Sequence, residues 1–383
     1  MSDRLAGYRL PDVSAALAKQ AGEHDRSAVF PAAGLAEVHA AGLLTATVGP
    51  RYGGPGAGLA DTVTILRALG RGDPSVALIS AMTMFTHALQ AIEPSWPDAL
   101  YREAVAESAQ RPVLINTLRV EPELGTPARG GLPATTARRV DGGWSLTGRK
   151  IFSTGAEGLT WMNVFARTED EPARVGGFLV RAGSPGVSIE RTWDHLGLRA
   201  SRSDDVTFTD TPVPDGATTG LAEPAPGQGS PVITAWNALG LTALYLGVAD
   251  AARDWLLRFL AERTPASLGR PLATLPRFQT AAGEIDAALI SAGTLISATA
   301  ARVDAGDQNA VARAGVAKLT ATRAAINAVQ DAVALTGNPG LTRRNPLERH
   351  LRDVLCARVH TPQDDSTLAA TGRAALATVT DAL

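Results

Sequence analysis

The sequence predicts an α+β fold, mainly α, in which two helical parts flank a middle β part. Three observations support this. Helical periodicity runs from about Asp12 to Ser108, strand-like composition follows to about Pro214, and long helical segments fill the chain from Ser230 onward. A chain of 383 residues exceeds one ordinary core. We therefore expect three units, at residues 1–111, 112–220 and 221–383.

The first part is predicted to be helical because its apolar residues recur at spacings of three and four. This holds for Pro31–Gly42, Thr62–Leu69 and Val76–Ile92. Arg51–Gly58 reads RYGGPGAG, and this glycine-rich stretch predicts a turn.

The middle part has the composition of a small β-barrel or sandwich. Its short segments are rich in β-branched and aromatic residues, and Gly- and Pro-containing turns separate them. The expected strands include Trp144–Thr147, Met162–Ala166, Gly177–Val180 and Val206–Phe208.

The third part is predicted to be an antiparallel helical bundle. Ile233–Leu260, Leu275–Ala305 and Gln308–Leu335 are long and carry polar faces, as bundle helices do. Thr218–Gly229, rich in Gly, Pro and Ala, is expected to link the β part to the bundle.

Composition excludes several classes of function. The formal net charge is −2 and no basic run alternates with aromatic residues, so a nucleic-acid partner is not expected. The single cysteine, Cys356, excludes a disulfide framework and a cysteine-based zinc site, and no metal is expected. No uninterrupted apolar stretch reaches the ~20 residues of a membrane span, and the first residues lack the apolar core of a signal peptide. We expect a cytoplasmic protein without a membrane partner.

Three motifs give the chain a resemblance to a known family. Val120–Pro127 (VEPELGTP) looks like the "TEPxxGSD" loop of the acyl-CoA dehydrogenases, and Gly148–Gly155 (GRKIFSTG) is similar to their "GxKxxITN" strand. Pro346–Asp353 (PLERHLRD) resembles their "RD" helix. The ordered set resembles the acyl-CoA dehydrogenases and the flavin-dependent monooxygenases that share their fold. This implies an N-terminal helical domain, a middle β domain and a C-terminal four-helix bundle.

The resemblance implies a flavin site around the second motif. Phe152 and Thr154 are two residues apart, so an ordinary strand would present both on one face. The resemblance assigns Phe152 to the flavin ring face and the Thr154 hydroxyl to the N5 edge. The alternative is an ordinary strand with Phe152 in the core. In the first motif, backbone amides and the Thr126 hydroxyl are expected to contact flavin oxygens. Val120 replaces the family's threonine there, which removes one hydroxyl contact.

Three further residues resemble dinucleotide contacts. Arg263 stands where the family has an arginine that reaches the diphosphate of a flavin held by a neighbouring subunit, which suits the planar guanidinium. Gln279 and Gly337 match positions bordering the dinucleotide. FAD is therefore favoured, with FMN possible, and a homodimer or homotetramer is expected. The alternative for Arg263 is a solvated surface arginine.

The catalytic glutamate of the acyl-CoA dehydrogenases has no counterpart at the two positions where the resemblance would place it. Eight residues after Asp353 stands Thr361, and early in the first bundle helix stands Asn237. Neither residue can act as a general base. His360 instead stands where the monooxygenase branch has a histidine, which is suited to proton relay. His87 and Ser153 are further catalytic candidates, while His195 and His350 are expected to be structural. The alternatives are a loop histidine for His360 and a buried, hydrogen-bonded one for His87.

The leading hypothesis is a two-component monooxygenase. A separate reductase would supply reduced flavin, and O₂ would form a flavin C4a-hydroperoxide that oxygenates an aromatic or heteroatom-containing small molecule. The sequence has no G-x-G-x-x-G unit for NADH, which agrees with this hypothesis. The second hypothesis is acyl-CoA dehydrogenase-like desaturation of a thioester with an unidentified base. The third is a catalytically silent flavoprotein or scaffold.

Overall fold

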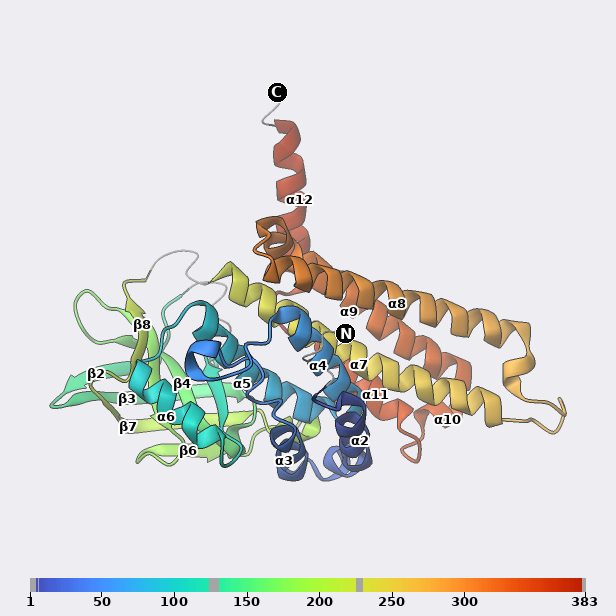
Figure 1. The fold of residues 1–383 in the computed structure, drawn as a ribbon, viewed down its shortest axis with the longest axis horizontal. Coiled ribbons are helices and arrows are strands. Elements are labelled where there is room, and N and C mark those ends of the chain that lie inside the picture. The colour runs from blue at the N-terminus through green and yellow to red at the C-terminus, as the bar shows by residue number, and fades with distance from the viewer. Residues whose placement is uncertain (1–4, 6, 124–130, 225–229, 381–383) are drawn as a thin grey trace.

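The computed structural model describes residues 5, 7–123, 131–224 and 230–380. Its order of elements confirms the predicted α+β architecture, with helices, then strands, then long helices (Figure 1). The helices of the first part are α2 (Leu10–Ser27), α3 (Ala32–Ala40), α4 (Leu59–Gly72), α5 (Pro74–Ile92) and α6 (Asp98–Ser108), with the 3-10 turn η1 (Pro50–Tyr52).

α5 shows how local sequence fixes a helix start. Asp73 is its N-cap, and the carboxylate accepts hydrogen bonds from the backbone N–H groups of Ser75 and Val76. Pro74 follows at the first helical position, where its missing N–H costs nothing. Asp73 also accepts a 2.6 Å hydrogen bond from His24 of α2, so the cap ties two helices together.

The middle part is one eight-stranded sheet. Its strand order is β6-β7-β3-β2-β4-β5-β8, and β1 pairs with β4 in parallel. The strands are β1 (Leu114–Leu118), β2 (Thr136–Val140), β3 (Gly143–Ser153), β4 (Leu159–Thr168), β5 (Val175–Arg181), β6 (Val187–Glu190), β7 (Asp204–Pro214) and β8 (Thr218–Ala222).

β8 corrects the predicted linker. Thr218–Ala222 was expected to be irregular, but it pairs antiparallel with β5 through Thr218↔Phe178 and Thr219↔Gly177. The two β-branched threonines favour the extended backbone, and the edge of the sheet offers a partner strand. Within residues 218–229, those at 225–229 lie outside the described residues.

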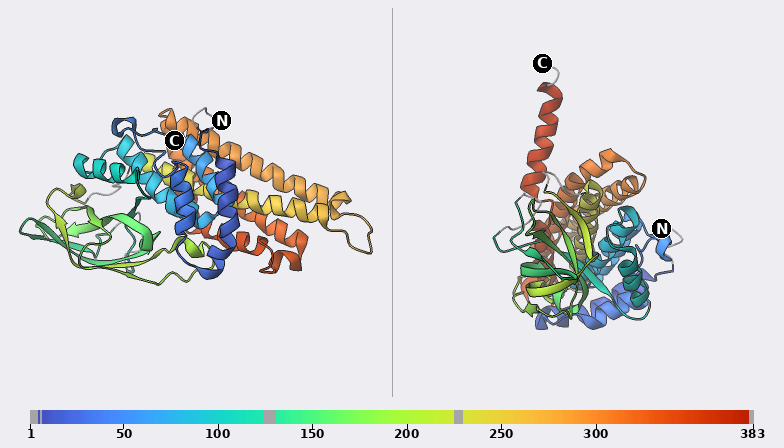
Figure 2. Two further views of the ribbon diagram at one scale, coloured as in Figure 1. Left: turned by 60° about the horizontal axis from the view of Figure 1, so that its bottom comes forward. Right: turned by 90° about the vertical axis from the view of Figure 1, so that its left-hand side faces the viewer.

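The third part consists of long antiparallel helices, and the predicted ranges are confirmed to within a few residues. Its helices are α7 (Pro231–Glu262), α8 (Pro276–Asp304), α9 (Gln308–Thr336), α10 (Asn338–Leu341), α11 (Leu347–Leu355) and α12 (Asp364–Thr380). α4 packs against both α7 and α8, while α12 projects away from the body of the protein (Figures 1 and 2).

The contact between α4 and α7 depends on two glycines. A Cβ on Gly70 would lie 2.2 Å from the Leu244 carbonyl oxygen, and one on Gly247 would lie 2.1 Å from the Arg67 carbonyl oxygen. Both distances are shorter than van der Waals contact, so only glycine allows the two backbones to approach this closely. The buried face of α7 is thereby fixed against the N-terminal helices.

Three helices of the described chain are long and apolar enough to cross a membrane by length and composition alone: α5, α7 and α8. In this fold 72% of the apolar window of α5 and 78% of that of α7 are buried inside the protein. The corresponding value for α8 is 28%. The apolar surfaces of α5 and α7 therefore form core.

Candidate functional site

The segment that follows α11 is held between α7 and α9. The side-chain amide of Asn237, on α7, donates a 2.9 Å hydrogen bond to the Thr361 carbonyl oxygen. The Lys318 ammonium, on α9, donates a 2.9 Å hydrogen bond to the His360 carbonyl oxygen. The fold therefore brings together the two positions, Asn237 and Thr361, at which the resemblance would place a catalytic glutamate.

His360 lies partly buried beside Tyr245, with ring centroids 5.7 Å apart and planes inclined at 41°. Burial, with a smaller contribution from the nearby Lys318 charge, lowers the pKa of His360 to about 4. The imidazole is therefore neutral at neutral pH. The Tyr245 hydroxyl is buried without a hydrogen-bond partner, and burial raises the Tyr245 pKa well above its ordinary value.

Asp364 is the first carboxylate after His360 along the chain. Its Oδ2 lies 3.3 Å from the Arg323 guanidinium, while its Oδ1 is buried, accepts no hydrogen bond and lies 3.9 Å from Lys318 Nζ. Asp364 also borders a cavity of about 350 Å³, whose other lining residues are Thr322, Arg323, Ile326, Asn327 and Arg358.

The expectation that Phe152 and Thr154 share one strand face is wrong. The Phe152 side chain is 53% exposed, whereas Thr154 is buried at 8% exposure. The β3–β7 register shifts between Lys150 and Ser153, and Phe152 has a left-handed backbone with φ of 55°. The irregularity interrupts the two-residue alternation of the strand. A positive φ is unusual for an aromatic residue and marks local strain.

The exposed Phe152 ring belongs to an aromatic cluster that was not predicted. Trp193 and His195 stack with centroids 3.6 Å apart and planes at 10°. Phe152 meets both edge-on, at 6.3 Å from Trp193 and 5.9 Å from His195. His195, expected to be only structural, thus lies beside the predicted flavin-facing ring. The signal available in the sequence was the two-residue spacing of the aromatic rings in Thr-Trp-Asp-His.

Thr154 faces into the protein, where its hydroxyl accepts a 3.1 Å hydrogen bond from the Ser203 hydroxyl. Ser203 in turn lies 2.9 Å from the Ser201 hydroxyl. The Thr154 carbonyl accepts a 3.0 Å hydrogen bond from the Asn116 amide of β1. Neither serine was singled out from the sequence, because Ser-Arg-Ser has no distinctive pattern.

Two other catalytic candidates are buried. His87 is completely buried in α5, and its Nδ1 lies 2.8 Å from the Tyr101 hydroxyl while Nε2 has no partner. Burial lowers the pKa of His87 to about 4. This matches the alternative of a buried, hydrogen-bonded histidine. The Ser153 hydroxyl is also buried and has no hydrogen-bond partner. Their catalytic roles remain predictions.

The predicted dinucleotide contacts gather at the opposite end of the bundle from the sheet. Arg263 caps the end of α7, Gln279 lies in the first turn of α8, and Gly337 follows α9. Because these helices are antiparallel, the three positions share the end of the bundle remote from β3 (Figure 1). The Gln279 amide donates to the Ala273 carbonyl at 3.0 Å, and Gly337 has a φ of 64°.

The first motif is described only in part. The Val120 carbonyl accepts a 3.0 Å hydrogen bond from the Ile151 N–H, which ties the motif to the end of β3. Thr126 lies outside the described residues. Across the described ranges, no group of three or more His, Cys, Asp or Glu side chains is arranged to hold a metal ion.

Comparison with known families matches most of the chain. The acyl-CoA dehydrogenase N-terminal, middle and C-terminal domain families match residues 13–92, 119–211 and 239–364, respectively. The chain is 32% identical over 350 residues to the putative acyl-CoA dehydrogenase YdbM of Bacillus subtilis (strain 168), a match that covers 91% of this chain and 90% of YdbM.

The chain is also similar to an amino sugar nitrososynthase and to the solved structure of KijD3. The amino sugar nitrososynthase RubN8 of Streptomyces rubradiris is 31% identical over 373 residues, covering 94% of this chain and 85% of RubN8. The structure of KijD3 in complex with FMN and dTDP-3-amino-2,3,6-trideoxy-4-keto-3-methyl-D-glucose superposes with a TM-score of 0.85 at 25% identity. It covers 98% of this chain and 95% of KijD3.

Proposed function

Because the chain belongs to the acyl-CoA dehydrogenase superfamily of flavin-dependent oxidoreductases, we propose that it is a reduced-flavin-dependent monooxygenase. A separate reductase would supply the reduced flavin, and O₂ would be the second substrate. The organic substrate would be an aromatic or heteroatom-bearing small molecule.

The observation that carries the proposal is the pairing of Asn237 with Thr361. Desaturation of a thioester requires a base that removes the α-proton, and neither a carboxamide nor a threonine hydroxyl has a suitable pKa. The amide of Asn237 is moreover engaged as a donor to the Thr361 carbonyl. Oxygenation by a reduced flavin does not require a base that removes an α-proton. A member of this superfamily that lacks the base is therefore better suited to oxygenation than to thioester desaturation.

The proposed flavin ring would lie against the exposed Phe152 ring, next to the strand end that carries the buried Thr154. Phe152 offers an accessible apolar ring, and Trp193 and His195 support it from the side. Thr154 offers a hydroxyl next to the strand end, held by Ser203. The bound flavin would supply the electrons and the activation of O₂ that no amino-acid side chain provides.

His360 is the residue proposed to move a proton. Its pKa of about 4 keeps the imidazole neutral at neutral pH, so one ring nitrogen donates a hydrogen bond and the other accepts one. The hydrogen bonds from Lys318 and Asn237 to the adjacent carbonyls fix the backbone that carries the ring. A neutral imidazole held in this way can pass a proton to or from a substrate heteroatom.

The relatives favour a nitrogen-bearing substrate within the proposed class. RubN8 is described as an amino sugar nitrososynthase, and KijD3 was solved with FMN and an amino sugar nucleotide. FMN is therefore a candidate cofactor. FAD is the other candidate, and Arg263 and Gln279 favour it. Arg263, Gln279 and Gly337 lie away from Phe152 in one protomer, so we propose that they serve a neighbouring protomer's flavin in a homodimer or homotetramer.

The test is single-turnover oxygenation. The protein is loaded with photoreduced FMN or FAD and mixed with ¹⁸O₂ and a panel of aromatic amines, amino sugars and thiophenes. The proposal expects ¹⁸O in at least one product and less hydrogen peroxide than in the absence of that substrate. Full conversion of O₂ to peroxide with every substrate would reject it, and failure to bind either flavin would favour the scaffold hypothesis.

Acyl-CoA dehydrogenation remains the second candidate because of Asp364. Asp364 is the first carboxylate in the chain after Thr361, and its Oδ1 lies 3.9 Å from Lys318 Nζ but accepts no hydrogen bond. If Asp364 is the base, acyl-CoA thioesters should bleach the oxidised flavin under anaerobic conditions. Asp364→Asn should abolish that bleaching, whereas Asp365→Asn should leave it intact.

A further inference from the structure

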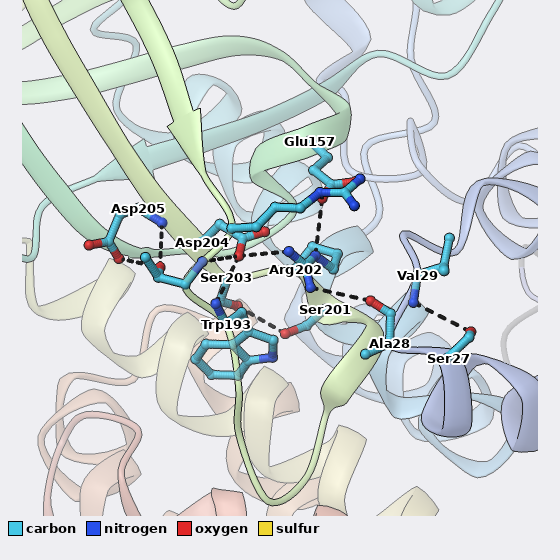
Figure 3. Close-up of polar contacts among 12 residues, drawn as sticks. Ser27, Ala28, Val29, Glu157, Trp193, Ser201, Arg202, Ser203, Asp204 and Asp205 are labelled. Carbon is cyan, nitrogen blue, oxygen red and sulfur yellow. Dashed lines mark hydrogen bonds and ion pairs between the residues drawn. The ribbon is translucent and has the colours of Figure 1, made fainter.

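Two arginines of the middle part, Arg119 and Arg167, have no counter-charge. Every other arginine of the described middle part forms an ion pair with a carboxylate. Arg202 is typical, because its guanidinium donates to Asp204 Oδ1 at 2.9 Å and to Glu157 Oε1 at 3.2 Å (Figure 3). Within the described residues, neither Arg119 nor Arg167 forms an ion pair or donates a side-chain hydrogen bond. Their charges are therefore available to an anion from outside the chain.

The two arginines belong to one face of the sheet. β4 is buried except at Phe165 and Arg167, which are two residues apart and share that face. β1 pairs with β4 in parallel through Leu118↔Val164, so the next residue, Arg119, falls opposite Phe165. The Arg119 guanidinium lies 4.8 Å from the centroid of the Phe165 ring. With strands ~4.8 Å apart and a rise of ~3.3 Å per residue, the backbones of Arg119 and Arg167 are about 8 Å apart. Their long side chains can converge on one small ligand.

The carboxylate closest to Arg119 along the chain is already engaged. Glu121 accepts a 2.6 Å hydrogen bond from the Lys150 ammonium and three more from Ala134 and Thr135. The sequence from Leu124 to Gly130 contains no Asp or Glu. The charge of Arg119 is therefore not neutralised locally.

The Arg167 side chain is also left without a protein partner. Its Nε is buried and donates to no acceptor within the described chain. The residue as a whole is only half-buried, so its terminal nitrogens reach the surface. A guanidinium of this kind can donate two parallel hydrogen bonds to a phosphate group. Two such guanidiniums match the two phosphates of a diphosphate in charge and in number.

The pair lies beside the candidate site. The Val120 carbonyl, next to Arg119, accepts a 3.0 Å hydrogen bond from the Ile151 N–H, and Phe152 follows Ile151. The Phe165 carbonyl accepts a 2.5 Å hydrogen bond from Lys150 of the same strand, β3. A ligand bound by the two arginines would thus have its anionic group near the strand end that carries the proposed flavin site.

We propose that Arg119 and Arg167 form a subsite for the diphosphate group of the organic substrate. The inference rests on the proposed function and narrows its substrate to a small molecule that carries a diphosphate. The flavin diphosphate is not the proposed occupant, because Arg263, which is proposed to hold it, lies at the end of the bundle remote from β3. Nucleotide-linked sugars and acyl-CoA thioesters both contain a diphosphate, and the experiment distinguishes them.

The experiment is isothermal titration calorimetry on the full-length protein without added flavin. The probes are inorganic pyrophosphate, UDP, coenzyme A and the dicarboxylate succinate. Arg119→Gln and Arg167→Gln remove one charge each, while Arg119→Lys and Arg167→Lys retain it. The control is Arg139→Gln, because the Arg139 guanidinium also lies over an aromatic ring, 4.7 Å from the Trp144 centroid, but is paired with Asp215. Circular dichroism verifies that each variant is folded.

The proposal expects pyrophosphate and at least one of UDP and coenzyme A to bind the wild type. Their dissociation constants should rise by roughly tenfold or more in each Gln variant, less in the Lys variants, and stay unchanged in Arg139→Gln. Tighter binding of UDP would indicate a nucleotide-linked sugar, and tighter binding of coenzyme A would indicate a thioester. Each of these two results supports the subsite.

Several results would overturn the proposal. They are no binding of any diphosphate, equal binding of succinate, or an equal loss of affinity in Arg139→Gln. An equal loss of FMN affinity in the Gln variants would assign the pair to the flavin and would also reject it. Product oxygenation by a wild type that binds no diphosphate would reject this inference alone. Diphosphate binding that depends on both arginines, without any ¹⁸O in products, would reject the proposed function alone.

Discussion

The side-chain amide of Asn237 hydrogen-bonds the carbonyl of Thr361 at 2.9 Å, across 124 residues of sequence. The two residues occupy the positions at which acyl-CoA dehydrogenases of either type would have a glutamate, judging by the resemblance. A hydrogen bond between an amide and a backbone carbonyl thus occupies the place of a catalytic base. Together with the Lys318 hydrogen bond one residue earlier, it makes the His360–Thr361 backbone a fixed support for the imidazole.

The first prediction concerns this bond. Asn237→Ala should lower the free energy of unfolding by about 1–3 kcal/mol, because the Thr361 carbonyl loses its donor in a partly buried place. It should also increase peroxide release at the expense of product, since His360 is then held only by Lys318. Urea unfolding and a peroxide assay check the two effects. The exposed Gln330→Ala, on α9, is the control.

Asn237→Asp sharpens the test because it conserves shape. An ionised carboxylate cannot donate to the Thr361 carbonyl and repels it, so this variant should be no more stable than Asn237→Ala at pH 8. Equal stability of Asn237→Asp and the wild type would contradict the structural role assigned to the amide.

The second prediction concerns His360. His360→Ala should bind flavin within about twofold of the wild type but lose productive oxygenation by about 100-fold or more, as expected for a group that transfers protons. Because the folded-state pKa is about 4, the imidazole stays neutral from pH 6 to pH 9. The wild-type coupling should therefore be constant over that range and fall as the pH approaches 4.

The control for His360 is His39→Ala, whose ring lies 2.8 Å from the Ser108 carbonyl on another part of the chain. It should leave coupling unchanged. Unchanged coupling in His360→Ala would instead make His360 a loop histidine, and a midpoint for the loss of coupling near pH 6.5 would mean that the imidazole is not buried in the working enzyme.

The helices were predictable from sequence because their signals are local and repeated. α7, α8 and α9 begin and end within a few residues of the predicted ranges, since each carries several turns of the same periodicity. The strand Thr218–Ala222 was missed because five residues beside a Gly- and Pro-rich stretch carry little signal. Its structure depends on the edge of β5, which is a non-local partner.

The site was predictable only as a set of positions. Motif order located Phe152, Thr154 and His360, but the opposite exposures of Phe152 and Thr154 come from an irregular register with β7 and a left-handed backbone. Neither feature can be read from the period of the strand. The hydroxyls of Ser201 and Ser203 likewise meet Thr154 through a strained turn, so nothing in Ser-Arg-Ser marks them as a site.

The third prediction concerns the buried ion pair of Lys150 and Glu121. Lys150 Nζ lies 2.6 Å from Glu121 Oε1 and 2.5 Å from the Phe165 carbonyl, and both side chains are almost fully buried. Lys150→Met leaves the carboxylate without its counter-charge and should cost about 3–5 kcal/mol. Urea unfolding measures this cost.

Glu121→Gln combined with Lys150→Met is the informative comparison, because it removes both charges. The double variant should be more stable than Lys150→Met alone, although Glu121 also accepts hydrogen bonds from Thr135 and the Ala134 N–H. A double variant less stable than both single variants would mean that the pair contributes through something other than mutual neutralisation.

The fourth prediction follows from Asp353 on α11. Burial is the main cause that raises the pKa of this carboxyl to about 7, although its Oδ1 accepts a 2.8 Å hydrogen bond from the Leu198 N–H. The folded state therefore holds the proton more tightly than the unfolded chain, whose carboxyl has a pKa of about 3.9. The contribution of Asp353 is most favourable below pH 4 and is progressively lost as the pH rises through 7.

Asp353→Asn removes this titration and keeps an oxygen that can accept from Leu198. Relative to the wild type, the variant should gain about 3 kcal/mol of stability between pH 5 and pH 8, which corresponds to about two pKa units of proton linkage. Urea unfolding at both pH values measures the difference. Asp307→Asn, at the N-cap of α9, should show no such gain, because the pKa of Asp307 is lowered. The prediction is contradicted if the stability difference between Asp353→Asn and the wild type does not change with pH. Asp353 would then be charged over the whole range and paired with the arginines of its own helix.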